Sequence, residues 1–430
     1  MQSTSIRHLS SLIGETVSLR GWVTHRRSSG KIAFVQLRDG SGSVQLVATH
    51  DDVDEASWEA LQQVGQEAAV QAVGVVQVDR RAPSGVEMHL TAFSVLGASE
   101  DFPISPKEHG TAFLMENRHL WLRSSRQYAA LRVRSEVSQA IRDFFYRRDY
   151  TLIDSPILTP AACEGTSTLF ATDYFGDPAF LSQSGQLYLE PAAAAFGKVY
   201  CFGPTFRAEK SKTRRHLMEF WMVEPEVAFL EFDGLLDLAE EFVCELVARV
   251  LDRCGDDLEV LERDTAPLEA VRPPFPRMSY TAAVELLTAR GVDMSWGSDF
   301  GAEEETLLAS QDERPVFIHR FPAAIKAFYM QPDPVDPRLA LGVDLLAPEG
   351  YGEIIGGSQR IHDHDLLLER IEQHDLPRAA FQWYLDVRKY GSFPHSGFGM
   401  GIERFVAWMC GLKHLRETIP YPRMLYRIYP

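Results

Sequence analysis

Short runs in which apolar and polar side chains alternate recur through the first hundred residues, and no other feature constrains the fold as strongly. Alternation with a period of two places every second side chain on one face of an extended strand. Five such runs occur, at residues 17–23, 32–37, 43–47, 69–78 and 87–96. A turn signal at 38–42 separates the second run from the third, and the segment around Trp58 and Leu61 has helical spacing.

Five strands and one helix in this length predict a small closed β-barrel of the oligonucleotide-binding (OB) type. Strand patterns alone also fit any other small β-domain. A proline-containing stretch at residues 100–107 then predicts a linker. We expect three parts: a barrel domain over residues 1–100, a hinge over 101–124 and a second domain over 125–430.

The second domain carries two long apolar stripes at helical spacing, one within residues 128–145 and one within 232–250. Strand-like runs lie between and after them, at residues 198–202, 220–223 and 315–319. The chain has no regular βαβ alternation and no glycine pattern of a phosphate loop or dinucleotide site. These patterns predict an α+β domain built on an antiparallel sheet.

The chain is acidic, with 43 Lys+Arg against 60 Asp+Glu and a formal net charge of -17. This average argues mildly against a nucleic-acid binder, although a local basic patch could override it. The five cysteines are scattered, without the spacing of a zinc site, which indicates reduced thiols in a cytoplasmic protein. We expect no membrane association, because no apolar run reaches the roughly 18 residues of a membrane span and no signal peptide is evident.

A concentrated basic segment, FRAEKSKTRRH at residues 206–216, lies between two strand-like runs. Arginine can hold a polyphosphate through paired hydrogen bonds, so such a loop suits a phosphate-rich ligand. A solvated hairpin tip is the ordinary meaning of a charge run. The apolar flanks and the Arg-x-Glu opening favour a binding loop here.

Two further segments combine glycines with charged residues. The sequence GFGMGIERF at 397–405 sets three alternating glycines before a helix, which permits close backbone approach and places Arg404 in the first turn. Asp344 and Glu353 fall on two neighbouring predicted strands, and paired carboxylates beside a phosphate site suit Mg²⁺. Taken singly, glycines before a helix are common, and acids on a hairpin are usually surface residues.

Together these segments resemble the signature motifs of the class II aminoacyl-tRNA synthetases. Residues 150–158, YTLIDSPIL, are similar to motif 1, residues 206–224 to motif 2 and residues 397–404 to motif 3. A preceding barrel is typical of the subgroup for aspartate, asparagine and lysine. The resemblance implies an antiparallel sheet flanked by helices that holds ATP, and a barrel that binds the anticodon.

The resemblance also implies roles in the ATP site. Arg207 is expected at the α-phosphate and Arg404 at the γ-phosphate, which makes these two the expected catalytic residues. Phe220 should stack on adenine, and Asp344 and Glu353 should hold Mg²⁺. The expected ATP-binding residues are Arg207, Glu209, Arg215, His216, Phe220, Glu353 and Arg404.

The choice of amino acid depends on one short string. Aspartate enzymes of the subgroup carry lysine in a Gln-Leu-aromatic-Lys string, whereas this chain has Leu189 at that position. Arg360 remains to bond the side-chain carbonyl of asparagine. Glu190 ends a polar strand predicted over 180–190 and could accept from, or orient groups around, the amide.

Three further residues match the family's contacts with the substrate amino group, namely Glu164, Gln186 and Glu224.

We therefore expect ATP-dependent ligation of asparagine to tRNA(Asn) through an asparaginyl-adenylate. Two alternatives stay open: an aspartate enzyme of relaxed tRNA specificity, and a synthetase-like paralogue such as an amidating asparagine synthetase or a regulatory binder. The role of residues 265–311 also stays open.

In the barrel, the resemblance implies that Phe34 stacks on the central anticodon base and that Gln45 reads its edge, with Arg26 adding positive charge. Phe34 could instead belong to the barrel core, since Ile32 and Phe34 share a strand face. Motif 1 forms the dimer interface in this family, so we expect a homodimer.

Overall fold

The computed structural model describes residues 3–430 except 83, 161–162, 164–167 and 212. The chain divides into two compact units, Met1–Thr111 and Ala112–Pro430. Each unit has its own hydrophobic core, because the buried apolar residues of the first unit form a cluster separate from those of the second.

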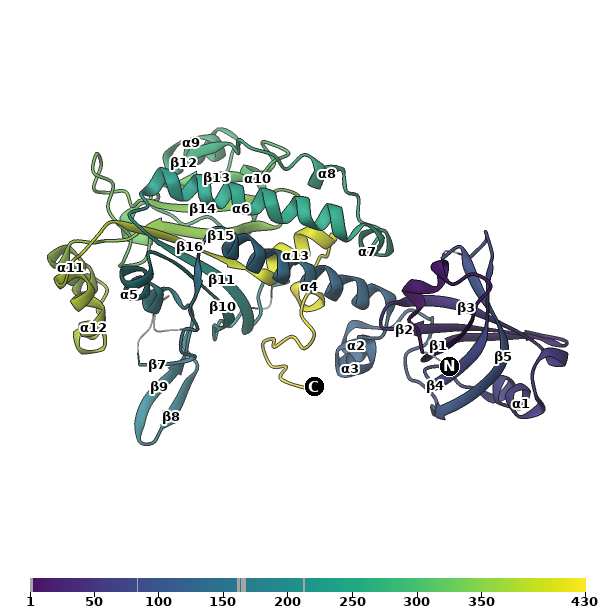
Figure 1. Cartoon of the computed structure of the whole chain (residues 1–430). Coiled ribbons are helices and arrows are strands. Elements are labelled where there is room, and N and C mark those ends of the chain that lie inside the picture. The colour runs from purple at the N-terminus through teal and green to yellow at the C-terminus, as the bar shows by residue number, and fades with distance from the viewer. Residues whose placement is uncertain (1–2, 83, 161–162, 164–167, 212) are drawn as a thin grey trace. The chain divides into compact units, whose positions relative to one another are not determined.

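Five strands of the first unit close into a barrel in the order β1-β2-β3-β5-β4 (Figure 1). The elements of this unit are η1 (Ile6–Ser11), β1 (Thr16–Ser29), β2 (Ile32–Asp39), β3 (Gly42–Thr49), η2 (His50–Asp52), α1 (Glu55–Gln63), β4 (Ala69–Val78) and β5 (Val86–Gly97). Alternate residues such as Val35 and Leu37 are fully buried in the barrel, as the period of two requires. The predicted barrel is confirmed.

An eight-stranded sheet forms the centre of the second unit, in the order β12-β13-β14-β15-β16-β11-β10-β6. Its strands are β6 (Thr151–Leu152), β10 (Lys198–Phe206), β11 (Glu219–Ala228), β12 (Arg277–Ser279), β13 (Val316–His319), β14 (Gly342–Ala347), β15 (Gly352–Gln359) and β16 (His395–Gly401). The predicted antiparallel sheet is confirmed from β13 to β10. The two edge pairs, β12–β13 and β10–β6, are parallel, and long connections join their strands, as parallel pairing needs.

Two long helices, α4 (Ser125–Tyr146) and α6 (Phe232–Arg253), share one large core with this sheet (Figure 1). Both predicted stripes are confirmed: residues such as Ile141 and Phe144 of α4 and Phe242 and Leu246 of α6 are fully buried. The other helices of this unit are α2 (Thr111–Glu116), α3 (Arg118–Trp121), α5 (Gln186–Phe196), α7 (Gly255–Val260), α8 (Ala266–Glu269), α9 (Tyr280–Ala289), α10 (Ala302–Ala309), α11 (His364–Gln373), α12 (Arg378–Lys389), α13 (Ile402–Cys410), η4 (Ala323–Ile325) and η5 (Leu415–Glu417).

A small sheet of β7 (Leu158–Thr159), β9 (Asp177–Leu181) and β8 (Ala171–Tyr174) projects from the second unit (Figure 1). The polar strand predicted over 180–190 is wrong beyond Leu181, because residues 186–196 form helix α5. That stretch, QLYLEPAAAAF, is rich in leucine and alanine, which favour a helix.

The segment after α6 contributes to the main core, since α7 and α8 bury Leu258 and Leu268 there. All five cysteines are free thiols, as expected. Across the described part of the chain, none of the helices combines the length and apolarity needed to cross a bilayer.

Candidate active site

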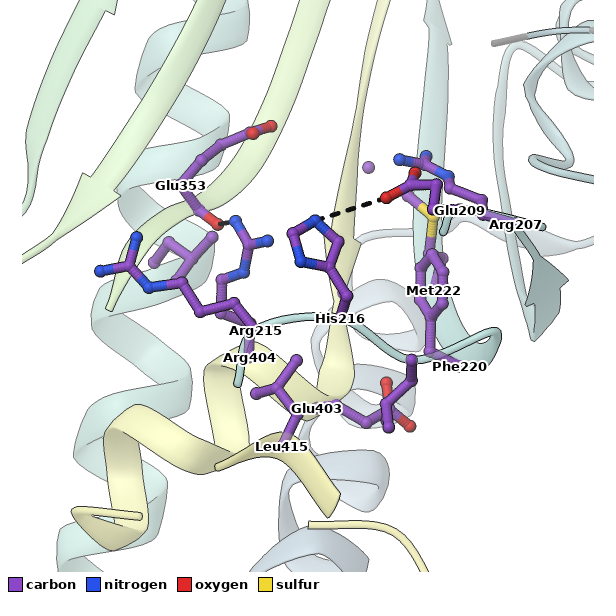
Figure 2. Close-up of a pocket in the computed structure, with 14 residues that line it drawn as sticks. Arg207, Glu209, Arg215, His216, Phe220, Met222, Glu353, Glu403, Arg404 and Leu415 are labelled. Atoms are coloured by element: carbon purple, nitrogen blue, oxygen red, sulfur yellow. Dashed lines mark hydrogen bonds and ion pairs between the residues drawn. The ribbon is translucent and has the colours of Figure 1, made fainter. Parts of the chain in front are cut away.

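A cavity of about 140 Å³ opens among strands β11, β15 and β16, helix α13 and the loop between β10 and β11 (Figure 2). Antiparallel pairing of β10 with β11 holds both ends of the basic segment, so its side chains project from a hairpin loop. All seven residues expected to bind ATP line this one cavity, namely Arg207, Glu209, Arg215, His216, Phe220, Glu353 and Arg404. The structure thus brings together residues that lie up to 197 positions apart, from 207 to 404.

Positive charge concentrates on one side of the cavity, where Arg215 of the loop and Arg404 of α13 lie together (Figure 2). Arg404 is fixed by a hydrogen bond that it donates to the backbone carbonyl of Glu353. His216 lies between this side and Glu209, with 3.3 Å from its Nε2 to Oε2 of Glu209. Burial, followed by the nearby arginines, lowers the pKa of His216 even though Glu209 opposes the shift. The site therefore favours a neutral histidine and an anionic ligand.

An aromatic ring and a guanidinium form the opposite wall. The guanidinium carbon of Arg207 lies 5.4 Å from the ring centroid of Phe220. Phe220 and Met222 are alternate residues of β11 and line the cavity together (Figure 2). A flat apolar surface next to an arginine suits a base and its attached phosphate.

Glycines of β16 keep the sheet open beneath the side chains of β11. A Cβ at Gly399 would lie 2.4 Å from Cε of Met222, and a Cβ at Gly397 would lie 2.1 Å from Oε2 of Glu226. A Cβ at Gly401 would meet nothing within 4 Å. A Cβ at Gly397 would also lie 2.4 Å from the backbone carbonyl of Pro225, so Gly397 is the glycine of the three that the neighbouring strand requires.

The two carboxylates expected to bind magnesium lie close together across β14 and β15. A Cβ at Gly356 would lie 2.6 Å from Oε1 of Glu353 and 3.8 Å from Oδ1 of Asp344. Burial raises the pKa of Asp344 to about 7; the charge of Lys326 opposes the shift, and that of Glu353 adds to it. Nζ of Lys326 lies 2.8 Å from Oδ2 of Asp344, a contact that the sequence analysis missed. Paired acids that repel each other beside a phosphate cavity fit a divalent cation.

Within the described residues, these acids belong to no group of three or more His, Cys, Asp or Glu side chains able to hold a metal ion. Mg²⁺ commonly takes one or two protein carboxylates and completes its shell with water and substrate phosphates. The donor set of Asp344 and Glu353 is therefore adequate for Mg²⁺ bound together with a nucleotide, and inadequate for a metal site made by protein alone.

Arg360, directly after β15, forms a buried two-pronged ion pair with Glu226 of β11. The distances are 3.1 Å from Nε to Oε1 and 2.9 Å from Nη2 to Oε2, and Nη1 donates to Oγ of Ser358 at 2.8 Å. Burial raises the pKa of Glu226, although Arg360 opposes the shift. The sequence analysis missed Glu226, although it lies four and six positions beyond Met222 and Phe220 and so shares their strand face.

Glu190 lies on α5 and is wholly enclosed by hydrogen-bond donors. Its carboxylate accepts from Gln186 Nε2 at 3.1 Å, Tyr384 Oη at 2.7 Å and His395 Nε2 at 2.9 Å, and also from Arg388. Although burial opposes ionisation, Arg388 and His395 hold the pKa of Glu190 well below its usual range. A carboxylate has about four acceptor positions, so this arrangement favours a supporting role for Glu190.

The remaining residues expected near the substrate are placed as follows. Glu224 accepts from Ser184 Oγ, from the backbone N–H of Gly185 at 2.8 Å and from Cys201 Sγ at 3.3 Å, and so holds the turn before α5. Gln186 is buried and donates to Glu190. Glu164 lies outside the described residues. Hydrogen bonds thus hold Glu224 to the turn before α5 and Gln186 to Glu190.

Leu189 lies among apolar side chains and not with the polar residues Glu190, Glu224 and Gln186. It is fully buried in a small apolar cluster with Ala193, Val199, Cys201 and Phe393. The position at which aspartate enzymes of the subgroup carry a lysine therefore supplies no positive charge in this chain.

A second cavity, of about 400 Å³, lies on the outside of the barrel and is lined in part by Arg27, Phe34 and Gln45. Phe34 is half-buried, whereas its neighbours Ala33 and Val35 fill the core. The alternative of a core residue is thereby excluded. The guanidinium of Arg27 lies 4.6 Å from the ring centroid of Phe34, which leaves a cationic and aromatic surface suited to single-stranded nucleic acid.

Gln45 and Arg26 differ in their relation to this cavity. Nε2 of Gln45 donates to Oε2 of Glu87 at 3.0 Å within the cavity wall. Arg26 donates instead to the carbonyls of Leu61 and Gln62 at the end of α1. Arg27, one position along the chain, is the arginine that lines this cavity beside Phe34.

Comparison with known proteins agrees with this geometry. Residues 111–425 match the family model of tRNA synthetases class II (D, K and N), and residues 17–96 match that of the OB-fold nucleic acid binding domain. The asparagine–tRNA ligase of Desulforamulus reducens is 58% identical over 430 residues, with 100% of both chains covered. The chain belongs to the class II tRNA synthetases, in the branch of the asparagine–tRNA ligases.

Solved structures of the class II synthetases support the same branch. The asparaginyl-tRNA synthetase of Pyrococcus horikoshii complexed with asparaginyl-adenylate is 42% identical, with a TM-score of 0.97 and 100% of both chains covered. The aspartyl-tRNA synthetase of Entamoeba histolytica is 26% identical, with a TM-score of 0.85 and coverage of 100% of this chain and 93% of that chain. The two branches share the fold, and this chain is nearer to the asparagine enzymes in both measures.

Proposed function

We propose that this protein ligates asparagine to tRNA(Asn) with ATP, through an asparaginyl-adenylate. The Arg360–Glu226 pair is the observation that carries the choice of amino acid. The amide of asparagine offers a carbonyl oxygen, which can accept from Arg360, and an NH₂ group, which can donate to Glu226. Aspartate would instead bring a carboxylate against Glu226, where the charge of Arg360 is already matched.

Roles in the first step follow from the walls of the ATP cavity. The α-carboxylate of asparagine attacks the α-phosphorus of ATP, and the bond to the β-phosphate breaks with release of pyrophosphate. Arg207 neutralises charge at the α-phosphate, Phe220 holds adenine, and Arg404 binds the γ-phosphate. Positioning and charge neutralisation provide the acceleration, so a covalent nucleophile is not needed.

In the second step a ribose hydroxyl of the terminal adenosine of tRNA attacks the carbonyl carbon of the adenylate. AMP and a proton leave, and asparagine becomes esterified to the tRNA. Asp344 and Glu353 would hold Mg²⁺ when nucleotide is bound. Bound there, the metal would supply charge neutralisation for the phosphates.

The earlier alternatives have less support. An aspartate enzyme would need a second cation near the substrate side chain, and Leu189 lies in an apolar cluster instead. A paralogue without tRNA ligase activity, such as an amidating asparagine synthetase, could use the ATP cavity but would have no use for the cationic and aromatic surface on the barrel.

Partners and surroundings are part of the same proposal. The anticodon loop of tRNA would bind the barrel surface around Phe34 and Gln45, and the protein would act in the cytoplasm. A second copy of the chain would cover the motif 1 segment, whose side chains Leu152, Ile157 and Leu158 are 42%, 44% and 44% exposed. Apolar side chains exposed together in this way mark interaction surfaces.

Charging of tRNA(Asn) and tRNA(Asp) transcripts with labelled asparagine and aspartate tests this function. We expect asparagine to be esterified to tRNA(Asn) alone. Esterification of aspartate to either tRNA would overturn the assignment of the amino acid, and absence of any charged product would overturn the ligase function.

A further inference from the structure

Helix α10 belongs to residues 265–311, the stretch whose role the sequence left open, and it touches the basic loop of the ATP cavity. Nη1 of Arg215 lies 3.3 Å from Oε2 of Glu305, and Nη2 donates to Oγ1 of Thr306 at 3.4 Å. Nη2 also donates to the backbone carbonyl of Gly350. Three of the five N–H donors of this guanidinium are thus engaged, which leaves two for a ligand in the cavity.

Glu305 also connects the contact between α10 and Arg215 to strand β15, at the edge of the cavity. Its carboxylate lies against the backbone at the start of β15, next to Gly352. The space around the pair is full, since a Cβ at Gly352 would lie 2.2 Å from Oε2 of Glu305 and 2.9 Å from Nη1 of Arg215. Gly352 has φ +70, a conformation that glycine adopts without strain. Loop, helix and strand therefore meet at one carboxylate.

The charges explain why Arg215 needs such a partner. Burial lowers the pKa of Arg215, and the like charges of Arg404 and Arg214 lower it further, while Glu305 opposes them. Like charges repel each other more strongly where burial weakens solvent screening. Without Glu305, Arg215 would keep its hydrogen bonds to Thr306 and Gly350 but lose the negative charge that offsets Arg404 and Arg214, so its guanidinium would be held less firmly beside Arg404.

We propose that Glu305, with Thr306, is a positioning residue for ATP, which holds Arg215 where the terminal phosphates of ATP bind. The identity of the ligand rests on the proposed function; the positioning itself rests on the contacts of α10 with the loop. This gives α10 a specific role in nucleotide binding, although none of its residues lines the cavity.

Direct titration of ATP with Mg²⁺ by calorimetry tests the proposal on the full chain, using Glu305→Gln and Thr306→Val. We expect Glu305→Gln to raise the Kd for ATP roughly three- to tenfold, the size of one part-buried ion pair. Asparagine affinity should not change. Glu303→Gln is the matched control, because it removes the same charge from an exposed position of the same helix.

A double-mutant cycle with Arg215→Ala separates positioning from a general effect on folding. Glu305→Gln should add less than twofold to Kd in the Arg215→Ala background. An equal rise of Kd in both backgrounds, or no rise in the wild-type background, would overturn the proposal. Pyrophosphate exchange is measured separately on the wild type, so failure of the ligase function is seen in that assay and not in these titrations.

Discussion

At the scale of single residues, the proposed discrimination between asparagine and aspartate depends on an acceptor and a donor that are already paired. Glu226 and Arg360 are both at least nine-tenths buried, so their orientation is fixed before a substrate arrives. The neutral amide of asparagine can hydrogen-bond to both members of the pair, because it has a donor and an acceptor. The carboxylate of aspartate would bring a third charge to the buried pair, at a desolvation cost of several kcal/mol.

The substitution Glu226→Gln tests this argument with little change in shape. We expect the preference for asparagine over aspartate in adenylate formation to fall by at least about tenfold, because removal of one buried charge relieves the repulsion of aspartate. Competition in pyrophosphate exchange measures the ratio, and Glu285→Gln on the exposed face of α9 is the control. An unchanged ratio would show that Glu226 does not contact the substrate side chain.

A second effect at this scale concerns acid stability. Burial, with Arg320 and Arg277 nearby, lowers the pKa of His319 to about 4, whereas a histidine in the unfolded chain titrates near pH 6.5. Between about pH 4 and pH 6.5, His319 is protonated in the unfolded chain and neutral in the folded protein. The stability that depends on His319 is therefore complete above pH 6.5 and is lost as pH falls towards 4.

Thermal unfolding at pH 7 and pH 5 checks this sign. We expect His319→Gln to lose fewer degrees of Tm between pH 7 and pH 5 than the wild type loses. The exposed His119→Gln should behave as the wild type. A larger loss in His319→Gln would contradict the linkage.

At the scale of elements, β16 needs glycine at Gly397, on the face where it meets β11. Gly397→Ala would drive a Cβ to 2.1 Å from Glu226 and 2.4 Å from the carbonyl of Pro225. We expect a loss of roughly 1–3 kcal/mol in stability, as for an overpacked core, and a greater loss of adenylate formation because Glu226 is displaced.

Gly401→Ala is the matched control on the same strand, since its Cβ would have open space. Its thermal unfolding should stay close to that of the wild type; pyrophosphate exchange is compared only between Gly397→Ala and the wild type, because Gly401 lines the ATP cavity. An equal loss of stability in Gly397→Ala and Gly401→Ala would contradict this explanation. It would mean that β16 needs glycine for its backbone conformation and not to avoid contact with β11.

The element scale also shows where sequence reasoning succeeds and fails. Long periodic segments such as α6 and the run that forms β4 were predictable, because burial of one face fixes their period. Residues 186–190 were misassigned to a strand, since five residues hold too little of either period to decide. Lys326, Glu305 and Arg388 could not be found in this way, because their partners lie 18, 90 and 198 positions away and only the fold brings them together.

At the scale of the whole molecule, two separate cores imply two separable tasks. The barrel carries the aromatic surface around Phe34, and the second unit carries the ATP cavity. Changes on the barrel should therefore affect the step that uses tRNA, and adenylate formation should continue without the barrel's contribution.

Phe34→Ala tests this division. We expect kcat/KM for tRNA charging to fall roughly tenfold or more, since base stacking on an aromatic ring contributes about 1–3 kcal/mol, while pyrophosphate exchange without tRNA stays the same. Val95→Ala, on another part of the barrel surface, is the control. An equal fall in both assays would show that Phe34 serves the stability of the protein instead of tRNA binding.

Pyrophosphate exchange with ATP, Mg²⁺ and one amino acid at a time, without tRNA, tests the central claim most directly. The proposed contact of the buried Arg360–Glu226 pair with the substrate side chain predicts exchange with asparagine, and none above background with aspartate or lysine. Exchange that is faster with aspartate than with asparagine would contradict this account of the side-chain pocket.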